Sequence, residues 1–169
     1  MIKTVRRITA IALTLIAITA GIIAPASANS AGAFQHLRNR GNDLCMDIGS
    51  VAVGTPVGMH ACNYNGSYAS QVWFFQWDPV ASGFDITNQA SGLCMDVASY
   101  APGAVVGMNN CRYAEFYLSQ KWISISNSRL QSRGDSTKCM DLGSYASGTK
   151  VTLYWCNSSP GYLSQQWLP

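Results

Sequence analysis

The sequence predicts an all-β fold made of three copies of one unit, and three observations carry that prediction. One frame, Cys-x-Asp followed by a second Cys and by Gln-x-Trp, occupies residues 45–73, 94–122 and 139–167. In every copy the second Cys follows the first by seventeen residues and precedes the Gln by nine. No window places apolar residues at the i, i+3, i+4 and i+7 positions of a helix. Short alternating runs are instead cut by Gly, Pro, Asn, Asp and Ser, which is typical of strands joined by turns.

Strand-like runs and turns also alternate outside this frame. The runs cover residues 34–37, 74–77, 84–87, 123–125 and 129–131, and the turns lie at 40–43, 78–79, 127–128 and 134–135. Each unit therefore has room for about four short strands, and the units span roughly residues 34–77, 78–125 and 126–169. A propeller needs at least four blades, so three such units predict a closed barrel with threefold pseudosymmetry and hairpins capping one end. That architecture is a β-trefoil, in which closure would remove exposed sheet edges.

The first 28 residues predict a secretory signal peptide. Three basic residues precede an apolar run over 8–23, and Ala-Ser-Ala at 26–28 is a small-residue cleavage site. A membrane anchor is the alternative, but the run is short for a span and no charge follows it until Arg38. We therefore expect a secreted, extracellular mature chain of residues 29–169, one domain by size, with no membrane span after cleavage.

The charge of the mature chain argues against a nucleic-acid partner. Three of the 11 Lys and Arg residues lie in the signal segment and none of the 8 Asp and Glu residues does, so eight of each sign remain. A neutral chain lacks the electrostatic footprint of a nucleic-acid binder. Its many Ser, Gly, Asn and aromatic residues suit a binder of neutral polar ligands, and equally a secreted β-protein with many turns.

Six cysteines, two in each repeat, predict a disulfide framework in a secreted chain, although six cysteines allow 15 connectivities in principle. If the units fold alike, the pairs are Cys45–Cys62, Cys94–Cys111 and Cys139–Cys156. Each would contribute on the order of 3 kcal/mol by restricting the unfolded chain. A zinc site is the alternative, but its ligand pairs usually lie two to four residues apart, and no two of these cysteines do.

Alternation of side chains along strands separates a polar face from a core face in each unit. In the third unit, Asp141 shares a face with Cys139, and the disulfide brings Thr152 and Tyr154 to the same side. The opposite, apolar face is expected to be core: Met140, Leu142, Val151, Leu153 and Trp155. The first unit places Asp47 with Gly58 and His60, and the second places Asp96 with Gly107 and Asn109. Their expected core residues are Met46, Ile48, Val57 and Met59, and Met95, Val97, Val106 and Met108.

The polar face of the third unit carries groups that suit a sugar. A carboxylate such as that of Asp141 accepts hydrogen bonds from adjacent hydroxyls, and the amide of Asn157 both donates and accepts. The ring of Tyr154 can cover the apolar face of a sugar. Taken singly, Asp141 could be a turn or capping residue at a strand end, and Tyr154 a surface aromatic of a strand. The convergence of Asp141, Tyr154 and Asn157 beside a disulfide favours a surface binding pocket. The Trp of each Gln-x-Trp is expected in the core, while Gln71, Gln120 and Gln165 brace the Asp from behind.

This pattern resembles the ricin B-type lectin family, the Q-x-W β-trefoils of secreted lectins and carbohydrate-binding modules, over residues 34–169. The resemblance implies up to three shallow sugar sites, one per unit, in which Asp47, Asp96 and Asp141 bind vicinal hydroxyls. It also assigns two further positions in each unit. The family's aromatic falls on His60, Asn109 and Tyr154, and its frequent polar residue four before the second Cys falls on Gly58, Gly107 and Thr152.

Departures from the family pattern rank the three units. Gly58 and Gly107 offer no side chain, and Asn109 offers no ring. An Asn directly after the second Cys, used by some mannose-binding relatives, occurs as Asn63 and Asn157, whereas the second unit has Arg112 there. The third unit is therefore the best candidate site, the first comes next, and the second is weakest.

The leading hypothesis is a secreted, non-catalytic, monomeric lectin that binds glycans or polysaccharides and needs no cofactor or metal. A glycosidase would require two carboxylates about 5–9.5 Å apart, whereas three of the eight acids are the dispersed Asp residues of the repeats. Serine hydrolysis is disfavoured because the chain contains no Gly-x-Ser-x-Gly motif.

The alternative hypothesis is a protein-binding trefoil, such as a protease inhibitor or an accessory subunit of a toxin or hydrolase. Five aromatic residues that follow the second Cys in two units would form its surface: Tyr64, Tyr68, Tyr113, Phe116 and Tyr117. Packing of these rings over the barrel mouth is the interpretation we favour.

Overall fold

The computed structural model describes residues 34–113 and 117–169, so the predicted signal peptide at 1–28 lies outside the described residues. The first repeat contains β1 (Phe34–His36), β2 (Arg38–Asn39), β3 (Cys45–Ile48), β4 (Val57–His60), the 3-10 helix η1 (Ala69–Gln71) and β5 (Val72–Asp78). The second contains β6 (Gly83–Asn88), β7 (Cys94–Val97), β8 (Val106–Asn109), η2 (Leu118–Gln120) and β9 (Lys121–Ile125). The third contains η3 (Ser126–Ser128), β10 (Arg129–Ser132), β11 (Lys138–Leu142), β12 (Val151–Trp155), η4 (Leu163–Gln165) and β13 (Trp167–Leu168).

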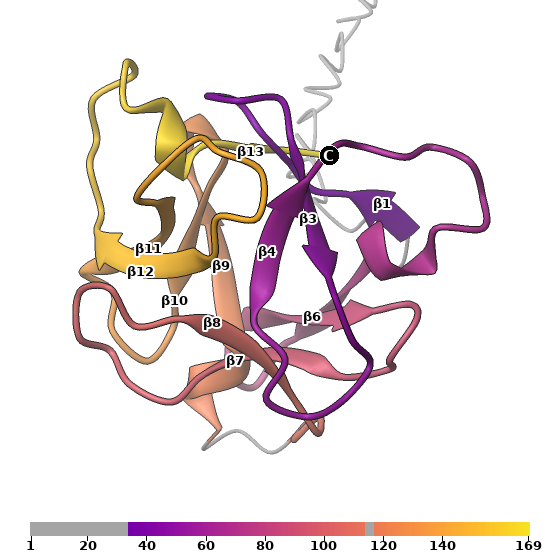
Figure 1. Cartoon of the computed structure of the whole chain (residues 1–169). Coiled ribbons are helices and arrows are strands. Elements are labelled where there is room, and N and C mark those ends of the chain that lie inside the picture. Colours follow the sequence, from indigo (N-terminus) through magenta and orange to yellow (C-terminus); the bar gives the residue numbers. More distant parts are fainter. Residues whose placement is uncertain (1–33, 114–116) are drawn as a thin grey trace, which may run out of the picture.

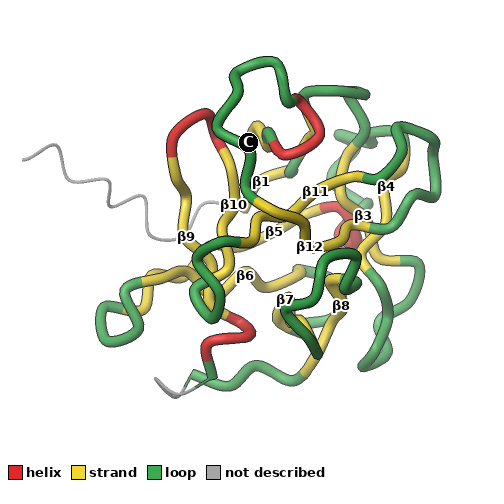
Figure 2. The backbone as a smooth tube through the Cα atoms, turned by 90° about the vertical axis from the view of Figure 1, so that its left-hand side faces the viewer, coloured by secondary structure: helices red, strands yellow, loops and turns green. Residues whose placement is uncertain are grey.

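Strands and single helical turns thus make up the ordered elements of the described chain (Figure 2). Each repeat has four strands if β1 and β2 are counted as one strand interrupted at Leu37. The all-β, trefoil-like arrangement predicted from the three frames is therefore present.

The hairpin of each frame pairs in the same register. Asp47 lies opposite Gly58, Asp96 opposite Gly107, and Asp141 opposite Thr152 in antiparallel pairs. Because register fixes which side chains share a face, the predicted polar and apolar faces follow in all three copies. The core residues expected from the alternation are at most 5 % exposed, with the exception of Trp155.

The three Trp residues of the Gln-x-Trp motifs pack in this core, as predicted. Trp73 and Trp122 are fully buried and Trp167 is 3 % exposed. Each indole Nε1 donates to the carbonyl of the Met that follows the first Cys, at 3.2–3.4 Å: Met46, Met95 and Met140. The indole thereby buries a large apolar ring while its one polar group keeps a partner.

The three predicted disulfides are confirmed. Cys45–Cys62, Cys94–Cys111 and Cys139–Cys156 each join Cα atoms 4.9 Å apart. Among the described residues no cysteine is free, so these thiols are not zinc ligands.

The expectation of a closed barrel was wrong in one respect. Hydrogen bonds divide the strands into a nine-stranded and a four-stranded sheet, and β13 pairs with β2 alone. Both residues of β13 pair with β2, and no ladder joins β13 to β10. The ladder is therefore interrupted between β10 and β13.

A closed ring forms instead where the three hairpins meet (Figure 1). Gly54, Gly103 and Gly148 occupy equivalent hairpin positions, each with a φ of +84°, a conformation that glycine adopts without steric cost. Their amides donate to the carbonyls of the next hairpin at 2.7–2.8 Å: Gly54 to Met108, Gly103 to Leu153, and Gly148 to Met59. The first repeat thus binds the second, the second binds the third, and the third binds the first.

Candidate functional site

The Gln of each Gln-x-Trp motif holds the Asp of the same repeat. The side-chain Nε2 atoms of Gln71, Gln120 and Gln165 donate to the Oδ2 atoms of Asp47, Asp96 and Asp141 at 3.0, 3.2 and 3.3 Å. The Gln Oε1 accepts the amide of the residue after the second Cys, at 2.8 Å in every copy. Nε2 also donates to the carbonyl just before that Cys. The brace inferred from the sequence is thus present, and the buried Gln residues act by positioning the carboxylate.

The three Asp residues of the repeats are almost completely buried. Asp47, Asp96 and Asp141 are 8, 9 and 4 % exposed. In the first two repeats, Oδ1 of Asp47 and Oδ1 of Asp96 are buried and have no hydrogen-bond partner among the described residues. An unpartnered buried acceptor costs about 1–3 kcal/mol. A hydroxyl delivered by a ligand would relieve that cost at both positions.

In the second repeat, Asp96 lines a cavity of about 560 Å³. Asn109 shares the cavity wall and donates its Nδ2 to Oδ2 of Asp96 at 3.0 Å. Tyr100 and Tyr117 contribute aromatic side chains, and the Arg112 guanidinium lies 4.3 Å from the centroid of the Tyr117 ring. A carboxylate, an amide and two phenols therefore surround one opening.

In the first repeat, Asp47 lines a smaller cavity of about 370 Å³, together with Gly58 and His60. The third repeat supplies Gly148 and Lys150 to the same wall. The site is thus built by two neighbouring hairpins, in keeping with the ring described above. His60, at the predicted aromatic position, is exposed at the cavity margin.

In the third repeat, both oxygens of Asp141 have partners. Oδ1 accepts the Leu142 amide at 2.7 Å, and Oδ2 accepts the Tyr162 hydroxyl at 3.4 Å in addition to Gln165. Burial, and then the Asp141 charge, raise the pKa of Tyr162 above its usual value. Tyr154 is exposed at 46 %, while the Thr152 hydroxyl turns to the Asp141 carbonyl at 3.4 Å.

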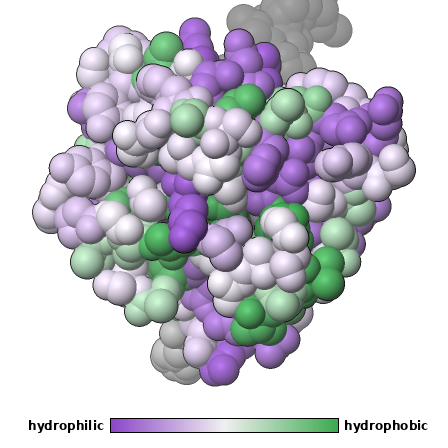
Figure 3. All heavy atoms as spheres, viewed as in Figure 1, coloured by the Kyte–Doolittle hydropathy of each residue, from purple (hydrophilic) through white to green (hydrophobic). Residues whose placement is uncertain are grey.

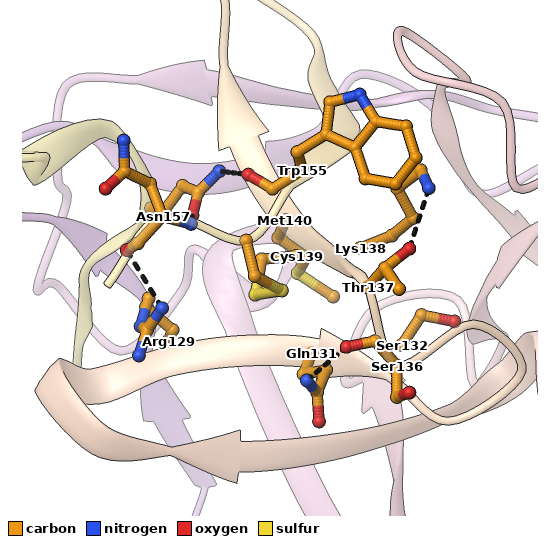
Figure 4. Close-up of a disulfide and its surroundings, with 12 residues drawn as sticks. Arg129, Gln131, Ser132, Ser136, Thr137, Lys138, Cys139, Met140, Trp155 and Asn157 are labelled. Atoms are coloured by element: carbon orange, nitrogen blue, oxygen red, sulfur yellow. Dashed lines mark hydrogen bonds between the residues drawn. A yellow bond between two sulfur atoms is a disulfide. The ribbon is translucent and has the colours of Figure 1, made fainter. Parts of the chain in front are cut away.

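The two Asn residues that follow the second Cys shape the backbone. Oδ1 of Asn63 accepts the Asn65 amide at 3.0 Å, and Oδ1 of Asn157 accepts the Ser159 amide at 2.9 Å. The Asn157 carbonyl also accepts a hydrogen bond from Arg129, as Figure 4 shows. These acceptor oxygens are occupied by turns, which leaves the Nδ2 groups as the atoms that a sugar could use.

The prediction that Trp155 lies in the core was wrong. Its side chain is 53 % exposed and lies over Lys138, whose Nζ is 3.2 Å from the ring centroid (Figure 4). Trp155 is the last residue of β12 and pairs with Lys138 at the first residue of β11, beyond the apolar centre of the hairpin. Asp135 and Thr137 bind the ammonium, so the indole covers a buried cation there.

Tyr100 and Tyr117 line the cavity of the second repeat, and the sequence did not assign either of them to a binding site. Tyr100 and Tyr145 lie six residues after the first Cys, and Tyr117 and Tyr162 lie three residues before the Gln. A search for aromatics recurring within the frame would have found them. Lys150 could not be assigned in this way, because it reaches the site of another repeat.

Three of the aromatics expected to pack over the barrel mouth are largely exposed. Tyr64, Tyr68 and Tyr113 are 66, 46 and 58 % exposed. Tyr117 lines the cavity of the second repeat, and Phe116 lies outside the described residues.

The surface over the three hairpins mixes hydrophilic and hydrophobic side chains (Figure 3). Within residues 34–113 and 117–169, no helix is long and apolar enough to cross a membrane. The same residues contain no group of three or more His, Cys, Asp or Glu side chains that could hold a metal ion.

Comparisons with known proteins agree with this arrangement. The family model of the ricin-type β-trefoil lectin domain matches residues 81–168, more than half of the chain. No curated protein matches significantly.

Three solved structures illustrate the similarity in fold. The designed threefold-symmetric protein ThreeFoil is 22 % identical, with a TM-score of 0.65 over 79 % of this chain and 95 % of its own. The Rhizoctonia solani agglutinin is 21 % identical, with a TM-score of 0.65 over 85 % of this chain and 96 % of its own. The C-half of the earthworm R-type lectin, solved with GalNAc, is 13 % identical, with a TM-score of 0.63 over 80 % and 95 %.

Proposed function

Because the chain belongs to the ricin-type β-trefoil lectin domain family, we propose that it is a secreted, non-catalytic protein that binds glycans or polysaccharides. The mature protein is residues 29–169, a single domain and a monomer. Mass spectrometry of the protein exported by a secreting host tests the first part. A mature chain that retains residues 1–28 would contradict it.

One observation carries the proposal of sugar binding. In two repeats a buried Asp lines a cavity, with one carboxylate oxygen fixed by a Gln and the other buried without a partner. A fixed acceptor that lacks a hydrogen bond is suited to a ligand hydroxyl, because binding removes the cost of the unpaired oxygen. The glycine opposite each of these Asp residues, Gly58 or Gly107, lines the cavity and leaves its volume open.

We assign the main site to the second repeat. Asp96, Asn109 and Tyr117 supply the acceptor, the amide and the ring that recognition of a sugar needs. The first repeat is the second site, in which Asp47 and His60 face an opening that Lys150 borders. The third repeat stays a predicted site through Tyr154 and Thr152. It ranks behind the other two because both oxygens of its carboxylate already have partners in the protein.

Two or three weak sites on one rigid body would gain affinity on a multivalent glycan surface. Retention on an immobilised polysaccharide should therefore exceed what the affinity for a free monosaccharide predicts. Equal affinities for monovalent and multivalent forms of the same sugar would argue for a single working site.

A glycan array on residues 29–169 tests the function. Asp47→Asn, Asp96→Asn and Asp141→Asn are run in parallel, since each variant removes one carboxylate and keeps its shape. Binding by the wild-type chain, reduced most by Asp96→Asn, is the expected outcome. A folded wild-type chain that retains no glycan would exclude the proposal.

The non-catalytic role is tested on a panel of reporter glycosides. The purified chain should leave them intact, because the carboxylates of the repeats lie in separate units and each is held by its own Gln. Turnover that follows the protein through purification and is lost in an Asp variant would show a hydrolase.

A protein partner is the second candidate, supported by the exposure of Tyr64, Tyr68 and Tyr113. Exposed tyrosines are common anchors in protein interfaces. A pull-down from culture fluid, repeated with an excess of free sugars, separates the two functions. A retained protein that the sugars do not displace would favour this second role.

A further inference from the structure

A buried ion cluster lies outside the three repeat sites. Lys121, fully buried at the start of β9, places its Nζ 2.7 Å from Oδ2 of Asp78 and 2.6 Å from Oδ2 of Asp85. The two Asp residues belong to β5 and β6. Val72 and Gln166 occupy the position of Lys121 in the other repeats, so the cluster belongs to the second Gln-x-Trp motif alone.

The cluster contains one more negative charge than positive charges. Asp78 is fully engaged, because its Oδ1 accepts the amides of Val80 and Ala81. Asp85 is 1 % exposed, and its Oδ1 has no hydrogen-bond partner among the described residues. Arg133 reaches this turn, but its Nε donates to the Ala81 carbonyl, and it forms no ion pair with a described carboxylate.

The pKa shifts agree with an incompletely compensated charge. Burial raises the pKa of Asp85 above its usual value, against the hydrogen bond from Lys121. The hydrogen bond from Lys121 lowers the pKa of Asp78, against the effect of burial. Burial lowers the pKa of Lys121, but the two carboxylates outweigh it and the pKa lies above its usual value.

Asp85 lies in the wall of a cavity of about 170 Å³, which we call the carboxylate cavity. Gln76 pairs with Asp85 across the β5–β6 ladder and lines the cavity beside it. Tyr113, 58 % exposed, lies at the same opening. The volume is below the range of about 300–1,000 Å³ typical of sites for drug-sized ligands, so it suits a single small group.

The chemistry of this wall favours a cation over a neutral hydroxyl. Asp78 and Asp85 have only Lys121 as a counter-charge, and an ammonium group would supply the missing one along with N–H donors. The ring of Tyr113 can contribute a cation–π contact to the same group. A neutral sugar would satisfy Oδ1 of Asp85 but leave the excess charge buried.

We propose that the carboxylate cavity is a fourth binding site, which takes the protonated amino group of an amino sugar. The ammonium group occupies the cavity beside the Asp85 carboxylate, the Gln76 amide and the Tyr113 ring. The preference for an ammonium group rests on the cavity alone, and the choice of a sugar as its carrier rests on the proposed function.

The test is a titration of the ¹⁵N-labelled chain, followed by NMR, with glucosamine, glucose and methylammonium in separate arms. Glucosamine should shift the amides of residues 76–85, while glucose at the same concentration should not. Absence of these shifts with glucosamine, or equal shifts with glucose, overturns the proposal. Methylammonium shifts without glucosamine shifts overturn the assignment to amino sugars. Shifts at Asp96 and Asn109 report on the lectin site separately, so failure of one site is distinguishable from failure of the other.

Variants separate the cavity from general effects. Asp85→Asn removes the charge and should weaken glucosamine binding at this cavity by about tenfold or more. Because this substitution disturbs a buried ion cluster, Tyr113→Ala and Gln76→Ala, both at exposed side chains, provide the second measurement and should each weaken binding by roughly twofold to fivefold. Tyr64→Ala, an equally exposed tyrosine elsewhere, is the matched control and should leave the titration unchanged. Unchanged binding in folded Tyr113→Ala and Gln76→Ala together would overturn the assigned geometry.

Discussion

The second and third repeats have the same scaffold and opposite arrangements at the Asp. Both carry the disulfide, the Gln brace and the buried Trp in the same register. Asp96 keeps one oxygen without a partner in the wall of a cavity. In Asp141, one oxygen accepts a hydrogen bond from the Leu142 amide, and the other accepts hydrogen bonds from Gln165 and Tyr162.

The two repeats therefore differ in the hydrogen bonds left open at the Asp, in addition to their residue types. Tyr154, Thr152 and Asn157 make the third repeat the richer one on the sequence, but its carboxylate is saturated by the protein. The second repeat lacks the ring at the family position, yet its Asp lines a cavity and retains an acceptor that the protein does not use. Unused hydrogen-bonding capacity, more than the residue inventory, therefore distinguishes the two.

The largest expected effect comes from removing the brace. Gln120→Leu removes the side-chain partner of the Arg112 amide and of the Asn110 carbonyl. Asp96 then keeps only its hydrogen bond from Asn109. The free energy of unfolding should therefore fall by about 3 kcal/mol. Gln165→Leu should cost less, because Asp141 keeps Leu142 and Tyr162. Urea denaturation of both variants measures the difference. A larger loss for Gln165→Leu would break the comparison.

Charge removal at the two Asp residues comes next. Asp96→Asn should weaken glycan binding by about tenfold or more, equal to about 1.4 kcal/mol. Asp141→Asn should change it by less than about twofold, because its oxygens are occupied by the protein. Titration calorimetry with a glycan identified on the array gives both values. Equal losses would mean that the two repeats are equivalent sites.

Filling the cavity sharpens the comparison without touching a charge. Gly107→Thr gives the second repeat the residue of the third, and its Cβ would lie 3.5 Å from the Thr55 carbonyl oxygen, an ordinary contact. We expect stability to change by less than about 1 kcal/mol and binding at this repeat to fall severalfold. Gly143→Thr, where a Cβ meets nothing within 4 Å, is the control. Undiminished binding by folded Gly107→Thr would show that the cavity is not the site.

The smallest effect concerns the hydroxyl that occupies Asp141. Tyr162→Phe removes one long hydrogen bond and should cost about 0.5 kcal/mol. The pKa of Tyr162 is raised in the folded state above the reference value of 10.0, so its stabilising contribution is complete below pH 10.0 and declines as pH rises through the folded pKa.

Chemical denaturation of wild type and Tyr162→Phe between pH 8 and pH 12 measures this contribution. The stability difference between the two chains should shrink above pH 10.0. A difference that stays constant to the highest pH would contradict the assigned bond.

The repeated frame was sufficient to predict the fold, the disulfides and most of the core. The spacing of Cys, Asp, Gln and Trp constrains each hairpin locally, and alternation then assigns Met46, Met95 and Met140 to the interior. The brace between Gln and Asp followed for the same reason. The alternation wrongly assigned Trp155 to the core. Alternation holds in the middle of a strand, whereas the pair of Trp155 and Lys138 lies at the end of the β11–β12 ladder, past its apolar centre.

The binding geometry was not predictable from one frame at a time. The cavity of the first repeat includes Lys150, which lies in another repeat, and that of the second includes Gly54. Whether an Asp oxygen is free depends on contacts such as Tyr162 with Asp141, which the residue types alone do not reveal. Equal motifs therefore have unequal surroundings.

The ring of hairpins has a consequence for how such a chain diversifies. Gly54 of the first repeat lines the cavity of the second, and Gly148 and Lys150 of the third line that of the first. A lone copy of the unit would carry an Asp but only part of its enclosure. A substitution in one hairpin can likewise alter the cavity of its neighbour, so the copies are free to diverge only as a linked set.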